Sequence, residues 1–98
     1  MSTVSQYEKE LLEAGERLGE LMGRTTGTNK ELLRSLHDQV ESVARQKQSE
    51  GILVDKAALF ACVIITSIEI DDDELVRAAG DYIDKDYMFC KSLREQKS

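Results

Sequence analysis

The sequence predicts an all-α fold, a small bundle of three or four helices with an apolar helix at its centre. Proline, the residue that most often interrupts helices, is absent from the 98 residues. Apolar residues recur at three- and four-residue steps, as they do along one face of a helix. Residues 57–70 are apolar on nearly all sides, with Glu69 as their only charge, and such a segment needs neighbours on nearly all sides. A chain of this length fits one domain, residues 1–98.

The first helix is expected over about residues 5–22. Its apolar residues alternate steps of four and three, which is the spacing of a heptad seam. They are Tyr7, Leu11, Ala14, Leu18 and Leu21. The seam predicts that this helix packs along its length against another helix.

Three glycines, Gly15, Gly19 and Gly23, stand four residues apart in this part of the chain. An interior glycine costs a helix roughly 1 kcal/mol relative to alanine. Two interpretations remain open. Either the glycines allow a second helix to approach closely, or the helix is weakly held and becomes ordered only when it is packed.

The second helix is expected over about residues 30–49. Thr28 or Asn29 can supply its N-terminal cap, since both side chains accept hydrogen bonds from free backbone amides. Its apolar stripe repeats the three-four spacing. The stripe consists of Leu33, Leu36, Val40 and Val43. Gly51 is suited to end the helix, because glycine adopts the left-handed conformation of a C-terminal cap without strain.

The third helix is expected over about residues 56–70, with Asp55 as its N-terminal cap. The alternative is a strand, because many of its residues are β-branched. The segment is longer than a usual strand and contains neither Gly nor Pro. No other segment alternates with a period of two, so a strand would have no partner. We therefore favour a helix.

The two cysteines, Cys62 and Cys90, do not make a disulfide framework. Cys62 lies in the apolar run and is expected to pack inside as a small hydrophobic residue. The N-terminus has neither the basic region nor the long apolar run of an export signal. We therefore expect reduced cysteines and a cytoplasmic location.

The fourth helix is expected over about residues 72–90, followed by a frayed tail over 91–98. Asp71 and Glu74 form a variant of the capping box at its start. The negative charges of this first turn also suit the positive end of the helix dipole. Together they make an acidic patch: Asp71, Asp72, Asp73 and Glu74.

The chain shows no catalytic, metal-binding or cofactor-binding motif. A calcium loop needs oxygen ligands at fixed offsets and a glycine at its sixth position, which the acidic patch lacks. His37 is the single histidine, and it lies beside an apolar stripe with no nucleophile placed next to it by the sequence. We therefore expect a protein that is not an enzyme and binds neither cofactor nor metal.

The charge balance argues against two classes of partner. With 19 acidic and 13 basic residues, the net charge of −6 repels phosphate groups, which disfavours direct binding of nucleic acid and of anionic membranes. The apolar segment is also too short to cross a bilayer. A basic partner suits the acidity better.

The sequence predicts a non-enzymatic protein–protein interaction module, such as an adaptor, a chaperone-like protein or an inhibitory protein, that acts through a helical face. Two heptad seams and an apolar helix exceed what a small monomer hides, so a homo-oligomer is expected, with another protein as partner. The interface candidates are Tyr7, Leu11, Leu18, Leu33, Leu36, Val40, Phe60 and Ile64.

Two alternatives remain. The first is an acidic regulator that uses its charge to occupy a basic, nucleic-acid-binding surface of a partner protein. The second is a small helical enzyme or ligand-binding protein, lined by Cys62, His37 and the tyrosines.

Overall fold

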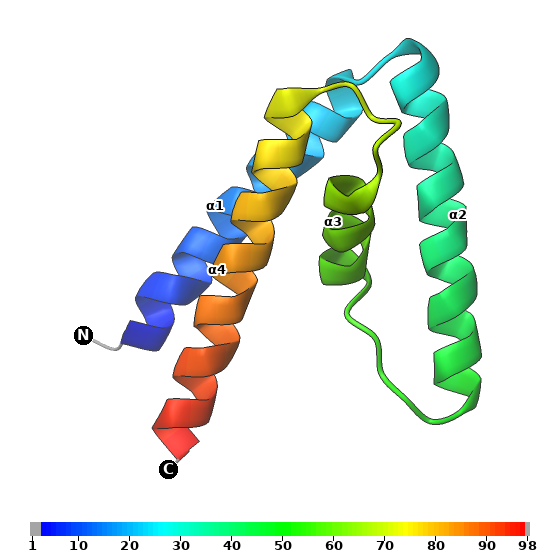
Figure 1. The fold of residues 1–98 in the computed structure, drawn as a ribbon. Helices are drawn as coiled ribbons and strands as arrows, with labels where there is room; N and C mark the ends of the chain where they lie inside the picture. Colours follow the sequence, from blue (N-terminus) through cyan, green and yellow to red (C-terminus); the bar gives the residue numbers. More distant parts are fainter. Residues whose placement is uncertain (1–2, 98) are drawn as a thin grey trace.

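Four α-helices form the protein in the computed structural model, which describes residues 3–97 (Figure 1). They are α1 (Thr3–Arg24), α2 (Gly27–Ser49), α3 (Lys56–Thr66) and α4 (Asp73–Lys97). Within this range there is no strand. The prediction of an all-α fold is confirmed, and the strand alternative for the apolar segment is wrong.

The helices pack in the order α1, α4, α3, α2. Extensive contacts join α1 with α4, α4 with α3, and α3 with α2. α1 and α4 are antiparallel, so that both chain ends lie at the same end of the molecule (Figure 1). α1 and α2 meet at a tight corner, where the Thr25 hydroxyl donates a hydrogen bond to the Leu21 carbonyl oxygen at 2.8 Å. From this corner the two helices diverge (Figure 1).

The hydrophobic core lies where α3 meets α4. Ile64 and Leu75 are its largest fully buried side chains, because each lies on the face that its helix turns toward the other. Leu33 and Val40 of α2 close this core from the side of α2. The opposite face of α3 is open, and Cys62 is exposed there. The prediction that Cys62 packs inside is therefore wrong.

The third helix is shorter than predicted, because it ends at Thr66 and not at Ile70. The Thr66 hydroxyl donates to the carbonyl oxygens of Cys62 and Val63, at 3.0 and 3.2 Å. Such bonds compete with the continuing helical ladder. Ser67 is then extended, and the buried side chain of Ile70 anchors the connection to α4.

Asn29 and Asp71 act differently from their predicted roles as helix caps. The Asp71 amide donates to Asn29 Oδ1 at 3.3 Å, and Asn29 Nδ2 donates to the Asp71 carbonyl oxygen at 3.5 Å. This pair ties the start of α2 to the loop before α4. α2 begins earlier than predicted, at Gly27, with Thr26 extended before it, and the side chain of Asp72 caps α4 by accepting from the Leu75 amide at 3.1 Å.

The two ends of the chain are more helical than predicted. α1 begins at Thr3, and α4 continues to Lys97, beyond the predicted end at about residue 90. Ser92 is buried in this last part of α4, although the sequence there is polar. Fraying of this segment stays a prediction. The predicted end of α2 agrees with the structure, since Gly51 has a φ of +83° and its amide donates to the Gln48 carbonyl oxygen.

The molecule has a large surface for its mass. Its radius of gyration is 14.7 Å, compared with about 13 Å for a typical domain of this length. Its accessible surface is 7026 Å², whereas a monomer of 11.0 kDa typically exposes about 5,600 Å². The divergence of α1 and α2 leaves surface uncovered that a closed bundle would bury.

Candidate functional site, a groove between two diverging helices

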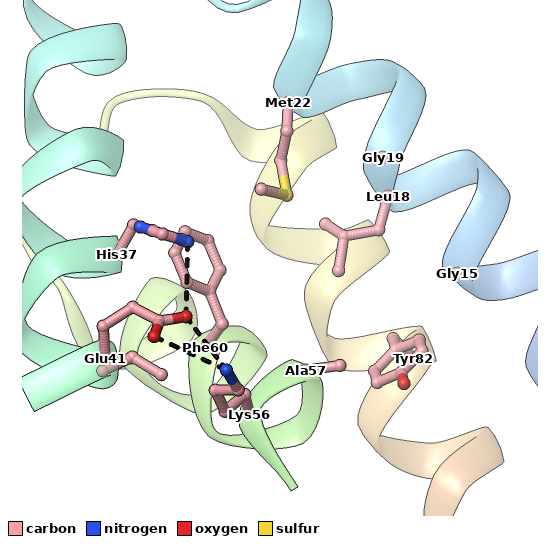
Figure 2. Close-up of a pocket in the computed structure, with 11 residues that line it drawn as sticks. Gly15, Leu18, Gly19, Met22, His37, Glu41, Lys56, Ala57, Phe60 and Tyr82 are labelled. Carbon is pink, nitrogen blue, oxygen red and sulfur yellow. Dashed lines mark hydrogen bonds and ion pairs between the residues drawn. The ribbon is translucent and has the colours of Figure 1, made fainter. Parts of the chain in front are cut away.

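A groove of about 340 Å³ lies between α1 and α2. All four helices contribute to it (Figure 2). α1 and α2 form its sides, while Phe60 of α3 and Tyr82 of α4 lie along its floor. The groove exists because α1 packs on α4 and α2 packs on α3, so that no direct packing closes the space between α1 and α2.

The inside of the groove is apolar. Leu18 and Val40 belong to opposite sides, and Phe60 lies between them; all three are largely buried. Met22 extends into the groove near the corner between α1 and α2 (Figure 2). An apolar space bounded by two helices suits the apolar face of a third helix, which is how helix-in-groove recognition works.

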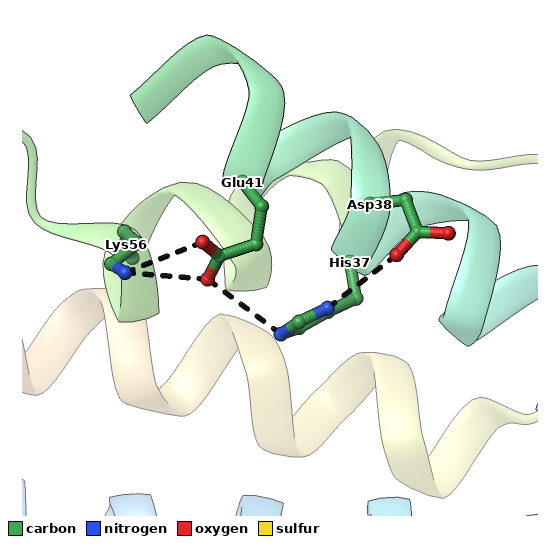
Figure 3. A network of polar contacts seen from close by, with 4 residues as sticks. All are labelled: His37, Asp38, Glu41 and Lys56. Carbon is green, nitrogen blue, oxygen red and sulfur yellow. Dashed lines mark hydrogen bonds and ion pairs between the residues drawn. The ribbon is translucent and has the colours of Figure 1, made fainter. Parts of the chain in front are cut away.

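A polar network forms the rim of the groove on the α2 side (Figure 3). Lys56 Nζ lies 3.3 and 3.5 Å from the two carboxylate oxygens of Glu41. His37 Nε2 lies 3.8 Å from Glu41 Oε1, and the His37 ring tilts over Phe60 with the ring centroids 5.9 Å apart. The Lys56 side chain is 56% exposed, whereas that of Glu41 is 30% exposed. An ion pair with one exposed partner contributes only about 0–1 kcal/mol. The network borders the groove and contributes little to the stability of the fold.

Tyr82, which lines the groove, has two acidic neighbours outside the lining. Burial raises the pKa of the Tyr82 hydroxyl, and the carboxylates of Asp55 and Asp86 raise it further. Burial also raises the pKa of Asp86, and Asp55 adds to this effect. Asp55 is held in place because it caps α3, accepting from the Ala58 amide at 3.1 Å.

Two of the three glycines of α1 border the groove. A Cβ added at Gly15 would lie 3.4 Å from Tyr82 Cε2, which is an ordinary van der Waals contact with a side chain of α4. A Cβ added at Gly19 would meet nothing within 4 Å, and the same is true of Gly23, which does not line the groove. Gly15 thus faces Tyr82, Gly19 leaves the groove open, and the close-approach interpretation stays a prediction.

The structure brings together only part of the ligand-binding set considered from the sequence. His37 and Tyr82 both line the groove, but Cys62 lies outside it. The distances from His37 to its two carboxylate neighbours, 3.8 and 3.9 Å, are longer than hydrogen bonds. Among residues 3–97 there is no group of three His, Cys, Asp or Glu side chains that could hold a metal ion.

The predicted interface candidates lie in the groove lining, in the core or at the half-buried surface. Leu18, Val40 and Phe60 line the groove and also belong to the core. Leu33 and Ile64 are buried in the core. The remaining three are half-buried: Tyr7, Leu11 and Leu36.

The acidic patch has structural roles in the first turn of α4 and just before it. Asp72 caps the helix, and Asp71 is paired through its backbone with Asn29. Glu74 forms an exposed ion pair of 3.4 Å with Arg17 of α1. The patch therefore helps to fix the junction of α1, α2 and α4.

Sequence reasoning missed the polar rim and the part played by Tyr82. Glu41 and Lys56 belong to different helices, and no sequence spacing indicates that they meet. Two features of the sequence involve residues that line the groove. They are the glycine spacing of α1, through Gly15 and Gly19, and the predicted interface residues Leu18, Val40 and Phe60.

None of the helices in the described range is both long and apolar enough to cross a membrane. Comparisons with protein-family models, with characterised proteins and with solved structures gave no significant match.

Proposed function

We propose that the protein is a non-enzymatic protein–protein interaction module, that its groove between α1 and α2 receives an apolar helix, and that it works as a homo-oligomer. The observation that carries the proposal is the open, apolar groove beside Leu18, Val40 and Phe60. An amphipathic helix laid there would contact all four helices and complete the bundle.

The uncovered surface supports the same proposal. The chain exposes about 1,400 Å² more than a typical monomer of its mass. A standard protein–protein interface buries about 800 Å² from each partner. The excess, which belongs to the whole chain and not to the groove alone, is larger than that area.

Gly19 offers a direct test. Gly19→Leu places a side chain in the groove without a clash, since a Cβ there meets nothing within 4 Å. Gly23→Leu is the matched control, because Gly23 is on the same helix and equally open but lies outside the groove. Circular dichroism should show that both variants are folded.

Chemical cross-linking of Lys56, which lies at the rim of the groove, then shows whether another chain occupies the groove. The experiment is done in cells or lysate of the organism that makes the protein. Cross-links from Lys56 to another chain, either a second copy or a different protein, are expected in the wild type and in Gly23→Leu. They should be lost in Gly19→Leu. Equal cross-linking in all three proteins would show that the groove is not the binding surface.

A further inference from the structure

We infer that the open face of α3 is the contact surface between two copies of this chain, in a two-fold dimer in which the two α3 helices pack antiparallel. The inference rests on the part of the proposed function that makes the protein a homo-oligomer, and it names the surface that joins the copies. This surface is separate from the groove, to which α3 contributes Lys56, Ala57 and Phe60.

The open face of α3 carries an uncovered apolar strip. Ala58, Cys62 and Ile65 form the strip, because they follow one another at steps of four and three residues and so lie on one side of the helix. Cys62 is exposed and Ile65 is 41% exposed, whereas Ile64, which faces α4, is fully buried. The Thr66 hydroxyl beside the strip donates to carbonyl oxygens of its own helix and needs no outside partner. A helix that is apolar all round is expected to be covered all round.

The charge of the chain favours a second copy as the cover of the strip. Residues 57–68 are the longest uncharged stretch of a sequence in which 33% of the residues are charged. Each copy has a net charge of −6, so two copies repel one another wherever their acidic surfaces meet. Contact through the strip brings no like charges together. A basic partner, in contrast, is attracted to the acidic surfaces elsewhere on the molecule.

Other exposed apolar side chains stand among charged residues. Leu12 of α1 is 64% exposed and Tyr87 of α4 is 57% exposed. Glu8 and Glu16 lie one helical turn on either side of Leu12, and Lys91 lies one turn after Tyr87. Exposed apolar residues of this isolated kind are ordinary on protein surfaces. The strip on α3 differs from them because it is continuous and uncharged.

The two most exposed large apolar side chains in the described range lie just beyond the two ends of α3. Leu53 precedes the helix and is 94% exposed, and Ile68 follows it and is 98% exposed. When two copies of α3 pack antiparallel, the start of each helix lies beside the end of the other. Leu53 then approaches Ile68 of the partner subunit, and the same contact occurs twice because the pairing is two-fold. The antiparallel dimer therefore covers both side chains.

This arrangement brings the two Cys62 side chains close together. Cys62 is the exposed residue of the strip nearest to the middle of the segment between Leu53 and Ile68. The axes of packed helices are about 8–10 Å apart, and Cα atoms lie about 2.3 Å from each axis. The Cα atoms of facing cysteines can therefore come within about 4.4–6.8 Å of each other, the range in which a disulfide forms. Cys90 of α4 is also exposed but lies outside the contact.

Size-exclusion chromatography with light scattering tests the contact. The wild type should have twice the chain mass of 11.0 kDa. Ile65→Glu places a charge in the strip and should be monomeric at concentrations where the wild type is dimeric, with the dimer dissociation constant raised about tenfold or more. Leu12→Glu is the matched control, because it makes the same kind of change at an exposed position outside the strip, and it should remain dimeric. Circular dichroism should show that both variants are folded.

Disulfide cross-linking tests the position of the contact. Cys90→Ser keeps only Cys62, and Cys62→Ser keeps only Cys90. Copper phenanthroline with dissolved oxygen takes two protons and two electrons from a pair of facing thiols, and the two sulfur atoms then form a bond. Cys90→Ser should give a covalent dimer on a non-reducing gel, whereas Cys62→Ser should not.

Three results would overturn the inference. They are a wild type that is monomeric at every concentration tested, a dimer that survives Ile65→Glu, and cross-linking through Cys90 that is as strong as cross-linking through Cys62. If the wild type is monomeric and Cys62 cross-links to a different protein in lysate, a foreign partner covers the strip, and the inference is wrong.

These outcomes differ from those that decide the proposed function. A dimer that survives Ile65→Glu keeps the homo-oligomer and removes only this interface. A monomeric wild type removes the homo-oligomer but leaves the groove, which is tested separately by the cross-links of Lys56 that depend on Gly19. Loss of those cross-links together with an intact dimer would support the groove and the α3 interface as two independent surfaces.

Discussion

The ring of Tyr82 on α4 lies directly over Gly15 on α1, where an added Cβ would be 3.4 Å from Tyr82 Cε2. Gly19, four residues further along α1, has open space in the same direction. The two glycines thus have different surroundings. Gly15 faces the Tyr82 ring, whereas Gly19 faces the open groove.

This difference predicts opposite responses to a large side chain. Gly15→Leu should destabilise the fold, because the new side chain displaces the Tyr82 ring from α1. Gly19→Leu should leave the stability unchanged or raise it by up to about 1 kcal/mol, since leucine is a better helix former than glycine. Urea unfolding followed by circular dichroism measures both. Equal effects of the two substitutions would contradict the assignment.

Two isoleucines, Ile64 within α3 and Ile68 just after its end, differ strongly in burial. Ile64 is fully buried, whereas Ile68 is 98% exposed. Ile64→Ala should lower the free energy of unfolding by about 2–5 kcal/mol, through lost burial and the cavity that remains. Ile68→Ala should change it by no more than about 0.5 kcal/mol. A large loss for Ile68→Ala in dilute solution would mean that this residue is covered.

Two neighbouring aspartates at the start of α4 should differ in their contribution to stability. Asp72→Ala removes the acceptor of the Leu75 amide and should cost about 1 kcal/mol of stability. Asp71→Ala should be close to neutral, because Asp71 pairs with Asn29 through backbone atoms that alanine retains. Thermal unfolding of both variants distinguishes them. If Asp71→Ala lowered the stability more than Asp72→Ala, Asp71 and not Asp72 would be the cap of α4.

The carboxyl group of Asp86 makes stability depend on pH. Burial and the neighbouring Asp55 raise its pKa above the value in the unfolded chain. Its contribution is therefore most favourable below the unfolded pKa of about 3.9 and is lost as the pH rises through the folded pKa. Asp86→Asn should stabilise the monomer at neutral pH, and this gain should vanish in acid.

Denaturant titrations of wild type and Asp86→Asn at several pH values, at low protein concentration, check the sign. The groups to consider around Asp86 are Asp55, Tyr82 and Cys90, since Asp86 and Asp55 also raise the pKa of the Tyr82 hydroxyl and the Cys90 thiol. A gain that persists unchanged in acid would show that the charge of Asp86 is not the cause.

The sequence was sufficient for the helices, because each is marked by apolar periodicity and by local end signals such as Asp55 and Gly51. It was less informative where tertiary contacts override local preference. Asn29 and Asp71 both have the chemistry of caps, yet they pair with each other across 42 residues of sequence. α4 continues beyond residue 90, where Ser92 is buried, and the polar sequence there does not indicate this.

The site was harder to predict than the fold. Leu18, Val40 and Phe60 were expected at an interface from their spacing, and they line the groove. The charged rim of Glu41 and Lys56 depends on how α2 and α3 are placed, and periodicity within one helix holds no information about that placement. The same reason explains why Ile64 was considered for an interface although it lies in the core.

The packing of α1 on α4 determines when the protein can fold during its synthesis. α1 finds its main partner only when α4, which follows α2 and α3 in the chain, has been synthesised. Until then its apolar seam lacks its main cover, and such surfaces bind chaperones or aggregate. Contacts between helices that are far apart in the chain also slow folding relative to helical proteins built from neighbouring hairpins. We therefore expect this four-helix fold to form only after α4 has been synthesised, and more slowly than a bundle of neighbouring hairpins.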